Sequence, residues 1–180
     1  MNTDISTSTN NQEIKKLIKN YPDFPKKGII YKDILPVLMN PEAFKSLIER
    51  MASTNICKES DAIIGIDARG FLFASGIALK LDKPIIVARK PGKLPGQLYT
   101  KAYKLEYGKS SLSIQKDALI NFKRLAIIDD LLATGGTVES VSDILSSEKK
   151  QITGLCVVIE LSHLKGREKL PFKVSSQIKY

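Results

Sequence analysis

The stretch RLAIIDDLLATGGTV, residues 124–138, contains the features that decide the fold. A short apolar run ends at Asp129 and Asp130, and a loop with two threonines and two glycines follows. An apolar run of this length is typical of a strand buried in a parallel sheet. Residues 137–147, TVESVSDILSS, have a helical pattern. The stretch therefore predicts a buried strand, a glycine-rich turn and a helix.

The same order of elements recurs on both sides of this stretch. DAIIGID (61–67), KPIIVARK (83–90) and ITGLCVVIEL (152–161) are predicted strands, and RGFLFASGIALKL (69–81) is a predicted buried helix. Strands that alternate with helices predict an α/β fold with a mostly parallel central sheet flanked by helices. From Leu98 to Ile114 the apolar residues tend to alternate around Gly108, which predicts a β-hairpin or flap.

The N-terminal part of the chain has a different pattern. EIKKLIKNY (13–21) has one apolar stripe and predicts a short helix, whereas the proline-rich residues 21–36 predict a loop or extended segment. A second helix is expected to begin at Asn40-Pro41. We expect residues 1–12 to be a disordered polar tail and residues 13–180 to form a single domain.

Composition excludes several classes of protein. The chain is 43% apolar and 26% charged, which is typical of a soluble globular protein, and no apolar run approaches the roughly 20 residues that span a bilayer. The polar N-terminus has no secretory signal, so a cytoplasmic location and no membrane partner are expected. The net charge of +9 is scattered without a DNA-binding motif, so no nucleic-acid partner is expected. Cys57 and Cys156 have neither metal-binding spacing nor a disulfide framework.

The glycine-rich loop has the composition of a phosphate site. Ligands of open α/β sheets bind at the carboxyl ends of the strands, and a helix N-terminus offers backbone N–H groups to a phosphate. Gly135 and Gly136 permit a close approach of the main chain, and the loop matches neither the mononucleotide P-loop nor the dinucleotide fingerprint. Asp129 and Asp130 suit the donors of a ribose diol. The stretch therefore predicts a site for a ribose 5-phosphate; the alternative is an ordinary strand-to-helix turn.

IIDDLLATGGTV (127–138) also resembles the phosphoribosyl-diphosphate motif of the type I phosphoribosyltransferases. Further segments are similar to the branch of this family that uses adenine, and they follow the family's order from about Tyr21 to Leu170. They are YPDFPKKGIIYKDILPVL, GIDARGFLFASGIAL, RKPGKLPG, YKLEYGKSSLSIQKDAL and LKGREKL. The resemblance implies the type I phosphoribosyltransferase fold with a flexible hood.

The resemblance implies a reaction in purine salvage. The 5-phosphoribosyl group passes from phosphoribosyl diphosphate to adenine, and AMP and pyrophosphate are released. Mg²⁺ is the implied cofactor, held mainly by the substrate diphosphate and water rather than by protein ligands. The family also implies a homodimer.

The donor site follows from the same resemblance. Asp129 and Asp130 are implied to address the ribose hydroxyls and to stabilise the cationic transition state, and the 5-phosphate is implied to bind Ala133, Thr134, Gly135, Gly136 and Thr137. The diphosphate is implied to lie against Asp67, Ala68, Arg69, Arg89 and Lys93, with a cis peptide between Asp67 and Ala68. The alternatives are that Arg69 only begins a helix and that the Arg89–Lys93 turn is a solvated basic turn.

The hood and the base pocket complete the implied site. In QLYTKAYKLEYGK (97–109), Glu106 matches the acid that manages the purine proton and Tyr107 the aromatic that covers the donor. The adenine pocket is implied to include Phe24, Ile30, Tyr31 and Lys32, although Lys32 stands where the family usually has arginine, which binds differently. His163, the sole histidine, matches no proton-transfer position and is expected in a surface loop.

Two other functions are compatible with parts of the sequence. A phosphoribosyltransferase for hypoxanthine, guanine or xanthine would share the donor loop, but strand 152–161 has no lysine to meet a 6-oxo group. A regulator that senses the donor and binds nucleic acid would need an added DNA-binding segment, and the polar tail is too short to supply one.

Overall fold

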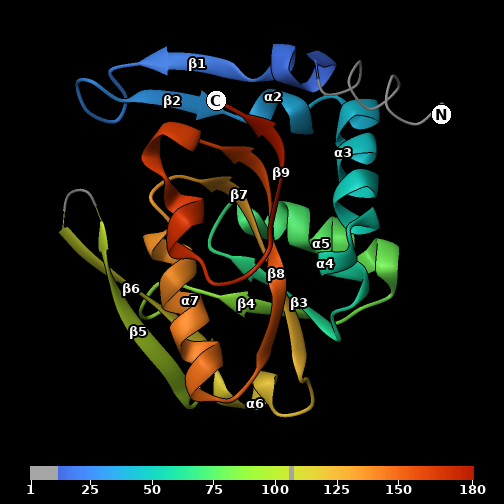
Figure 1. The fold of residues 1–180 in the computed structure, drawn as a ribbon, viewed down its shortest axis with the longest axis vertical. Coiled ribbons are helices and arrows are strands. Elements are labelled where there is room, and N and C mark those ends of the chain that lie inside the picture. The colour runs from blue at the N-terminus through green and yellow to red at the C-terminus, as the bar shows by residue number, and fades with distance from the viewer. Residues whose placement is uncertain (1–11, 106–107) are drawn as a thin grey trace. The chain divides into compact units, whose positions relative to one another are not determined.

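The structure is a computed structural model that describes residues 12–105 and 108–180. The chain divides into two compact units, residues 1–47 and 48–180, and each unit is considered by itself (Figure 1). All but the last residue of the predicted tail lies outside the described residues. The single domain over residues 13–180 stays a prediction.

The first unit contains a helix and a β-hairpin. Residues 12–17 are helical, and β1 (Lys19–Pro22) pairs antiparallel with β2 (Ile30–Asp33). The predicted helix over 13–21 was too long, because Tyr21 lies in β1 opposite Tyr31 and strand pairing ends the helical repeat. Short helix α2 (Leu35–Leu38) follows. The buried apolar residues of this unit are Ile14, Ile18, Ile34, Val37 and Leu47.

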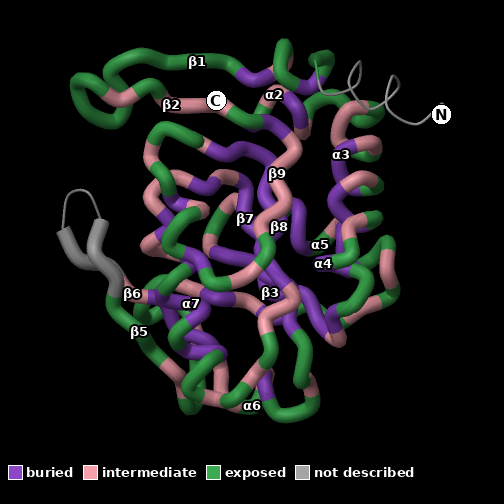
Figure 2. Tube along the Cα trace, in the orientation of Figure 1, coloured by how far each residue is buried: buried purple, intermediate pink, exposed green. Residues whose placement is uncertain are grey.

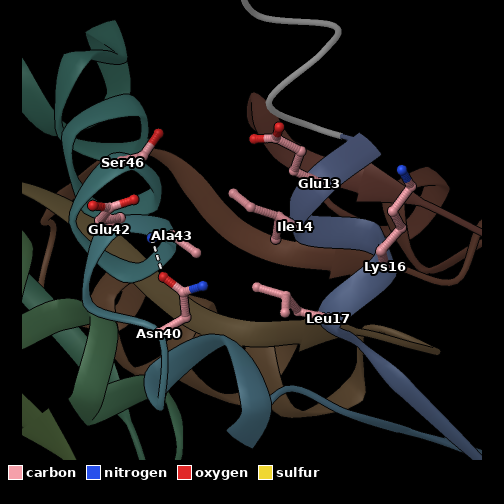
Figure 3. Close-up of a pocket in the computed structure, with 8 residues that line it drawn as sticks. All are labelled: Glu13, Ile14, Lys16, Leu17, Asn40, Glu42, Ala43 and Ser46. Carbon is pink, nitrogen blue, oxygen red and sulfur yellow. Dashed lines mark hydrogen bonds between the residues drawn. The ribbon is translucent and has the colours of Figure 1, made fainter.

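Helix α3 (Pro41–Ser53) begins where the sequence predicted. The Asn40 side chain accepts a hydrogen bond from the Ala43 N–H at 3.0 Å, which satisfies one of the free donors of the first turn. Residues of the 12–17 helix and of the start of α3 line an open groove, in which Ile14 and Leu17 point toward Asn40 and Ala43 (Figure 3). The cap thus fixes the start of α3 beside this groove.

The second unit is built on a five-stranded sheet in the order β4-β3-β7-β8-β9. Every neighbouring pair in it is parallel, which confirms the predicted fold class. The strands are β3 (Ala62–Ile66), β4 (Ile85–Ala88), β7 (Arg124–Leu132), β8 (Gln151–Glu160) and β9 (Val174–Lys179). Strand β9 was not predicted, because it is a partly polar edge strand with few apolar residues.

Helices α5 (Gly70–Leu81) and α7 (Gly136–Ser147) connect β3 to β4 and β7 to β8. The two connections run in opposite directions across the sheet, so right-handed crossovers place the helices on opposite faces (Figure 1). Short helix α4 (Asn55–Lys58) contacts β8, and α6 (Lys116–Leu119) precedes β7. The predicted hairpin is confirmed as β5 (Leu98–Leu105) and β6 (Gly108–Gln115), which pair antiparallel.

Burial is concentrated in the central strands (Figure 2). All five residues of β3 are buried, and Phe73 and Ile77 of α5 are fully buried. A Cβ atom on Gly65 would lie 2.8 Å from the Cβ of Ala74, so glycine lets α5 approach β3 closely. The strand order reverses between β3 and β7, which is where open α/β sheets bind their ligands.

No helix within residues 12–105 and 108–180 is long and apolar enough to cross a membrane.

Candidate active site

The carboxyl ends of β3 and β7 meet at the point where the strand order reverses. The 67–69 loop follows β3, and its Asp67–Ala68 peptide bond is cis, as the family resemblance implied. A Cβ atom on Gly70 would lie 2.9 Å from Asp129 Oδ1 and 2.9 Å from the Ile128 carbonyl oxygen. The start of α5 therefore lies directly against the end of β7, and Gly70 makes this approach possible.

Asp129 and Asp130, here called the acid pair, are buried inside the last part of β7. The strand continues through them to Leu132, two residues beyond the predicted end. The Asp130 N–H donates to Asp129 Oδ1 at 2.9 Å. Arg69 Nη2 lies 2.9 Å from Asp130 Oδ2, so the 67–69 loop supplies a cation to the acid pair.

The acid pair holds its protons more tightly than ordinary aspartates do. Burial raises the pKa of Asp129 well above its usual value, and repulsion from Asp130 adds to this increase. Burial also raises the pKa of Asp130, although the charge of Arg69 opposes the increase. Two buried carboxyl groups thus share the ion pair with Arg69, an arrangement that favours added cationic charge or hydrogen-bond donors from a ligand.

The 133–137 loop joins β7 to the first turn of α7. Gly135 has φ 86°, in the left-handed region, and a Cβ atom there would lie 2.9 Å from the Gly166 carbonyl oxygen. Both the conformation and the space require glycine at this position. The loop leads into a helix of 12 residues, whose N-terminal N–H groups and dipole favour an anion.

Arg89 and Lys93 lie on the other side of the 67–69 loop. Arg89 Nε lies 3.2 Å from Asp67 Oδ2, and Arg89 Nη1 donates to the Lys93 carbonyl oxygen at 3.3 Å. The Arg89 guanidinium is also 5.7 Å from the centroid of the Phe71 ring. The main chain of Arg89 pairs with Ser113 of β6, which connects this turn to the base of the hairpin. The structure therefore brings Asp67, Arg89 and Lys93 together.

The remaining predicted site residues lie either outside the described residues or in the first unit. Glu106 and Tyr107 lie outside the described residues. The predicted adenine-binding residues belong to the first unit and are described within that unit; they are Phe24, Ile30, Tyr31 and Lys32.

Within the first unit, the Phe24 and Tyr31 rings meet edge to face, with centroids 5.2 Å apart. The peptide bond between Phe24 and Pro25 is cis, which the sequence did not predict. Lys32 Nζ donates to Asn20 Oδ1 at 2.8 Å, across the β1–β2 ladder. Burial, and then the charge of Lys15, lower the pKa of Lys32.

One part of the site has no counterpart among the predicted residues. Gly166 lies against the 133–137 loop, since a Cβ atom there would overlap the Ala133 carbonyl oxygen at 2.1 Å. Gly166 is in the segment LKGREKL, which the sequence matched to the family without a function. The glycine and the arginine after it were the available signals, but their partners lie far away in the sequence. His163 is exposed in the preceding turn, Ser162–Leu164, which confirms its predicted surface position.

The sequence predicted neither protein ligands for a metal ion nor a disulfide between the cysteines. Residues 12–105 and 108–180 contain no group of three or more histidine, cysteine, aspartate or glutamate side chains that could hold a metal ion. Mg²⁺ held mainly by diphosphate and water stays a prediction. Cys57 and Cys156 are both buried and are not joined in a disulfide.

Comparison with known proteins assigns the family. A family model described as phosphoribosyl transferase domain matches residues 38–179. An adenine phosphoribosyltransferase from a Prochlorococcus marinus strain is 57% identical over 92% of this chain and 96% of the relative. The structure of the adenine phosphoribosyltransferase from Thermoanaerobacter pseudethanolicus has a TM-score of 0.90 at 43% identity, over 94% of this chain and 99% of that one.

A third relative was solved with ligands. The adenine phosphoribosyltransferase from Saccharomyces cerevisiae, in complex with an imino-altritol bisphosphate and adenine, is 35% identical, with a TM-score of 0.85 over 95% of this chain and 99% of that one. The chain therefore belongs to the phosphoribosyltransferases, and within them to the family of adenine phosphoribosyltransferases.

Proposed function

We propose that the protein transfers the 5-phosphoribosyl group from phosphoribosyl diphosphate to adenine and forms AMP and pyrophosphate. The proposal rests on one juxtaposition: a buried acid pair and a glycine-rich helix start lie next to each other at the switch point of the sheet. The first suits a ribose diol and the second a 5-phosphate. Adenine as the base is supported by the names of the relatives and by the adenine complex of the yeast enzyme.

In this proposal the donor binds to both the acid pair and the 133–137 loop. The backbone N–H groups of residues 133–137 hold the 5-phosphate, with the hydroxyls of Thr134 and Thr137 as further donors. Asp129 and Asp130 accept hydrogen bonds from the two ring hydroxyls. Because these carboxyl groups are already buried, they need little reorganisation when the donor binds.

The diphosphate of the donor is assigned to the 67–69 loop and the turn after β4. Arg69, Arg89 and Lys93 supply positive charge there, and Asp67 holds Arg89 in place. The acid pair also fits a hydrated Mg²⁺ ion, which typically takes one or two carboxylates, waters and substrate phosphates. When bound, Mg²⁺ neutralises the pyrophosphate leaving group. Asp129 and Asp130 would meet it directly or through water.

In the proposed reaction, the bond from the anomeric carbon to the pyrophosphate oxygen breaks and a ring nitrogen of adenine bonds to that carbon. Positive charge grows on the ribose ring and is stabilised by the acid pair. The proton that adenine loses is assigned to Glu106, and Tyr107 is assigned to cover the donor. The β5–β6 hairpin serves to exclude water, which would otherwise hydrolyse the donor.

Adenine is assigned to the segment that contains Phe24, Ile30, Tyr31 and Lys32. The apolar side chains of Phe24 and Ile30 would lie against the ring, and main-chain groups of the segment would read its edge. The hydrogen bond from Lys32 to Asn20 supports a use of this lysine within the β1–β2 hairpin. That use makes the departure from the family's arginine compatible with adenine binding.

We further propose a homodimer in the cytoplasm. Leu72 and Leu79 of α5 and Ile85 at the start of β4 are all at least 41% exposed. Leu79 and Ile85 also line a surface hollow together with Ser75 and Pro84. An apolar surface of this kind suits a second copy of the chain. Two buried thiols that are not joined in a disulfide fit the reducing environment of the cytoplasm.

The reaction is tested with Mg²⁺, phosphoribosyl diphosphate and, separately, adenine, hypoxanthine, guanine and xanthine. We expect AMP and pyrophosphate from adenine alone. The double variant Asp129→Asn, Asp130→Asn is the negative control, and the product that it forms defines the background of the assay. A product from an oxopurine would retain the donor site and overturn the assigned base. Saturable donor binding without any product would instead indicate the regulator of the same fold.

A further inference from the structure

A second buried carboxylate lies at the end of β8, the strand next to β7. Glu160 is the last residue of β8, and its side chain is only 6% exposed. Arg167 forms a bidentate interaction with this carboxylate: Nε donates to Oε1 at 2.8 Å, and Nη2 donates to Oε2. The Ser176 hydroxyl also donates to Oε2, at 2.6 Å. These three side chains are called the Glu160 cluster below.

Arg167 is held from a second strand as well. Its Nη1 donates to the Val174 carbonyl oxygen at 2.6 Å, and its Nη2 lies 3.2 Å from Ser176 Oγ. Val174 and Ser176 belong to the first half of β9, so the guanidinium is bonded both to the end of β8 and to β9. A planar donor group with this many partners has little freedom, which fixes the main chain around residue 167.

The residue before Arg167 is the one that lies against the 133–137 loop. A Cβ atom on Gly166 would be 2.1 Å from the Ala133 carbonyl oxygen and 3.0 Å from the Gly135 nitrogen. The φ angle of Gly166 is not positive, so lack of space rather than conformation requires glycine there. The contact is mutual, because a Cβ atom on Gly135 would meet the Gly166 carbonyl oxygen. The two backbones therefore determine each other's position.

We propose that Arg167, held by Glu160, is a positioning residue for the donor site. It fixes the backbone of Gly166 against residues 133–135, so that the loop has its phosphate-binding shape before the donor arrives. This inference rests on the proposed function, since it assigns a purpose to the shape of the same loop. Preorganised N–H groups bind an anion better than groups that must first be ordered.

The proposal predicts which kinetic constant changes. Neither Arg167 nor Glu160 is assigned a contact with adenine or with the reacting bond. Loss of the positioning contact should therefore weaken binding of phosphoribosyl diphosphate and leave binding of adenine nearly unchanged. A purely structural contribution would lower the amount of folded protein without separating the two substrates.

The sharpest test is Gly166→Ala, which adds one methyl group at the contact and leaves the Glu160 cluster intact. We expect the KM for phosphoribosyl diphosphate to rise by about 10- to 100-fold, with the KM for adenine within about twofold. Gly76→Ala is the matched control, because its Cβ would crowd Ile48, at 2.8 Å, within the packing of α5. It should lower the melting temperature without changing either KM. Equal donor affinity in Gly166→Ala and the wild type would overturn the proposal.

Arg167→Lys tests the cluster itself. Lysine keeps the charge but cannot form the bidentate hydrogen bonds, so the KM for the donor should rise less than in Arg167→Gln. Hydrogen exchange of the 133–137 amides in the protein without substrates provides a readout independent of activity. Exchange there should be faster in Gly166→Ala and Arg167→Gln than in Gly76→Ala. Unchanged exchange in Gly166→Ala and Arg167→Gln would contradict the inference even if the enzyme makes AMP. Faster exchange in these variants, with no AMP formed by the wild type, would contradict only the proposed function.

Discussion

Strands β7 and β8 are neighbours, and both have buried acids within their last four residues, yet the two sites differ in how their charge is compensated. Leu132 of β7 pairs with Glu160 of β8, so the acid pair and Glu160 lie near the same edge of the sheet. Glu160 accepts hydrogen bonds from Arg167 and Ser176, and these bonds lower its pKa to about 2. The bond from Arg167 makes the larger contribution. The pKa of Asp129 is instead raised by burial and by Asp130.

The difference separates a carboxylate whose charge is paired within the fold from carboxylates to which we assign a ligand. The negative charge of Glu160 is satisfied inside the chain, which stabilises the folded state. The acid pair has the Arg69 ion pair for two buried groups, so its charge is not fully compensated until a ligand supplies donors or cations. Active sites commonly retain such a cost in stability. The predictions below test this contrast.

The largest effect is expected for Arg167→Met. The substitution leaves the Glu160 carboxylate buried without its charged partner, which typically costs about 3–5 kcal/mol in the free energy of unfolding. Urea denaturation at neutral pH measures this loss. Adding Glu160→Gln to Arg167→Met should recover part of it, because the buried charge is then gone. If Arg167→Met were as stable as the wild type, Glu160 would not depend on its partner.

The next effect is on catalysis. Asp129→Asn and Asp130→Asn should each lower kcat/KM for phosphoribosyl diphosphate by about 100-fold, because in the proposed mechanism each removes negative charge that stabilises the cationic transition state. Steady-state rates with adenine in excess measure the loss. Glu49→Gln is the control, since Glu49 pairs with Lys80 at 3.1 Å and both side chains are exposed. Full activity in both aspartate variants would remove the acid pair from the mechanism.

A smaller effect of opposite sign is expected on stability. Because the pKa of Asp129 is raised in the folded state, the folded protein binds more protons than the unfolded chain above about pH 4. The contribution of Asp129 to the free energy of unfolding is therefore largest below that pH and is lost as the pH rises through the raised pKa. Asparagine keeps the acceptor for the Asp130 N–H and has no charge to bury.

Asp129→Asn should consequently match the wild type near about pH 4 and exceed its free energy of unfolding by about 0.5–2 kcal/mol near neutral pH. Thermal unfolding of both proteins at several pH values checks the trend. A constant difference over the whole range would mean that the carboxyl group is not the titrating group behind it.

The smallest effect is expected where an acid is exposed. Asp143 of α7 lies 3.2 Å from Lys101 of β5, and both side chains are about half exposed. Such surface pairs contribute little, so Asp143→Asn should change the free energy of unfolding by no more than about 0.5 kcal/mol. A loss as large as that of Arg167→Met would show that burial is not what separates the sites.

Local patterns in the sequence predicted most of the second unit correctly. The apolar runs of β3, β7 and β8 and the glycines after β7 each act within a few residues, as does the cap at Asn40 in the first unit. For the same reason the sequence predicted the acid pair and the 133–137 loop together, since they adjoin in the chain. The family resemblance added the cis peptide at Asp67–Ala68, which no local pattern predicts.

What the sequence by itself determined is therefore the strand, loop and helix that contain the proposed donor site. The tertiary structure alone decided which residues meet that site from elsewhere: Arg69 at Asp130, Arg89 at Asp67, and Gly166 at Ala133. It also decided the protonation of the buried acids, because burial and charged partners shift a pKa and both depend on the packed fold. Contacts between distant segments are set by the packing of the whole sheet, which no short stretch of sequence specifies.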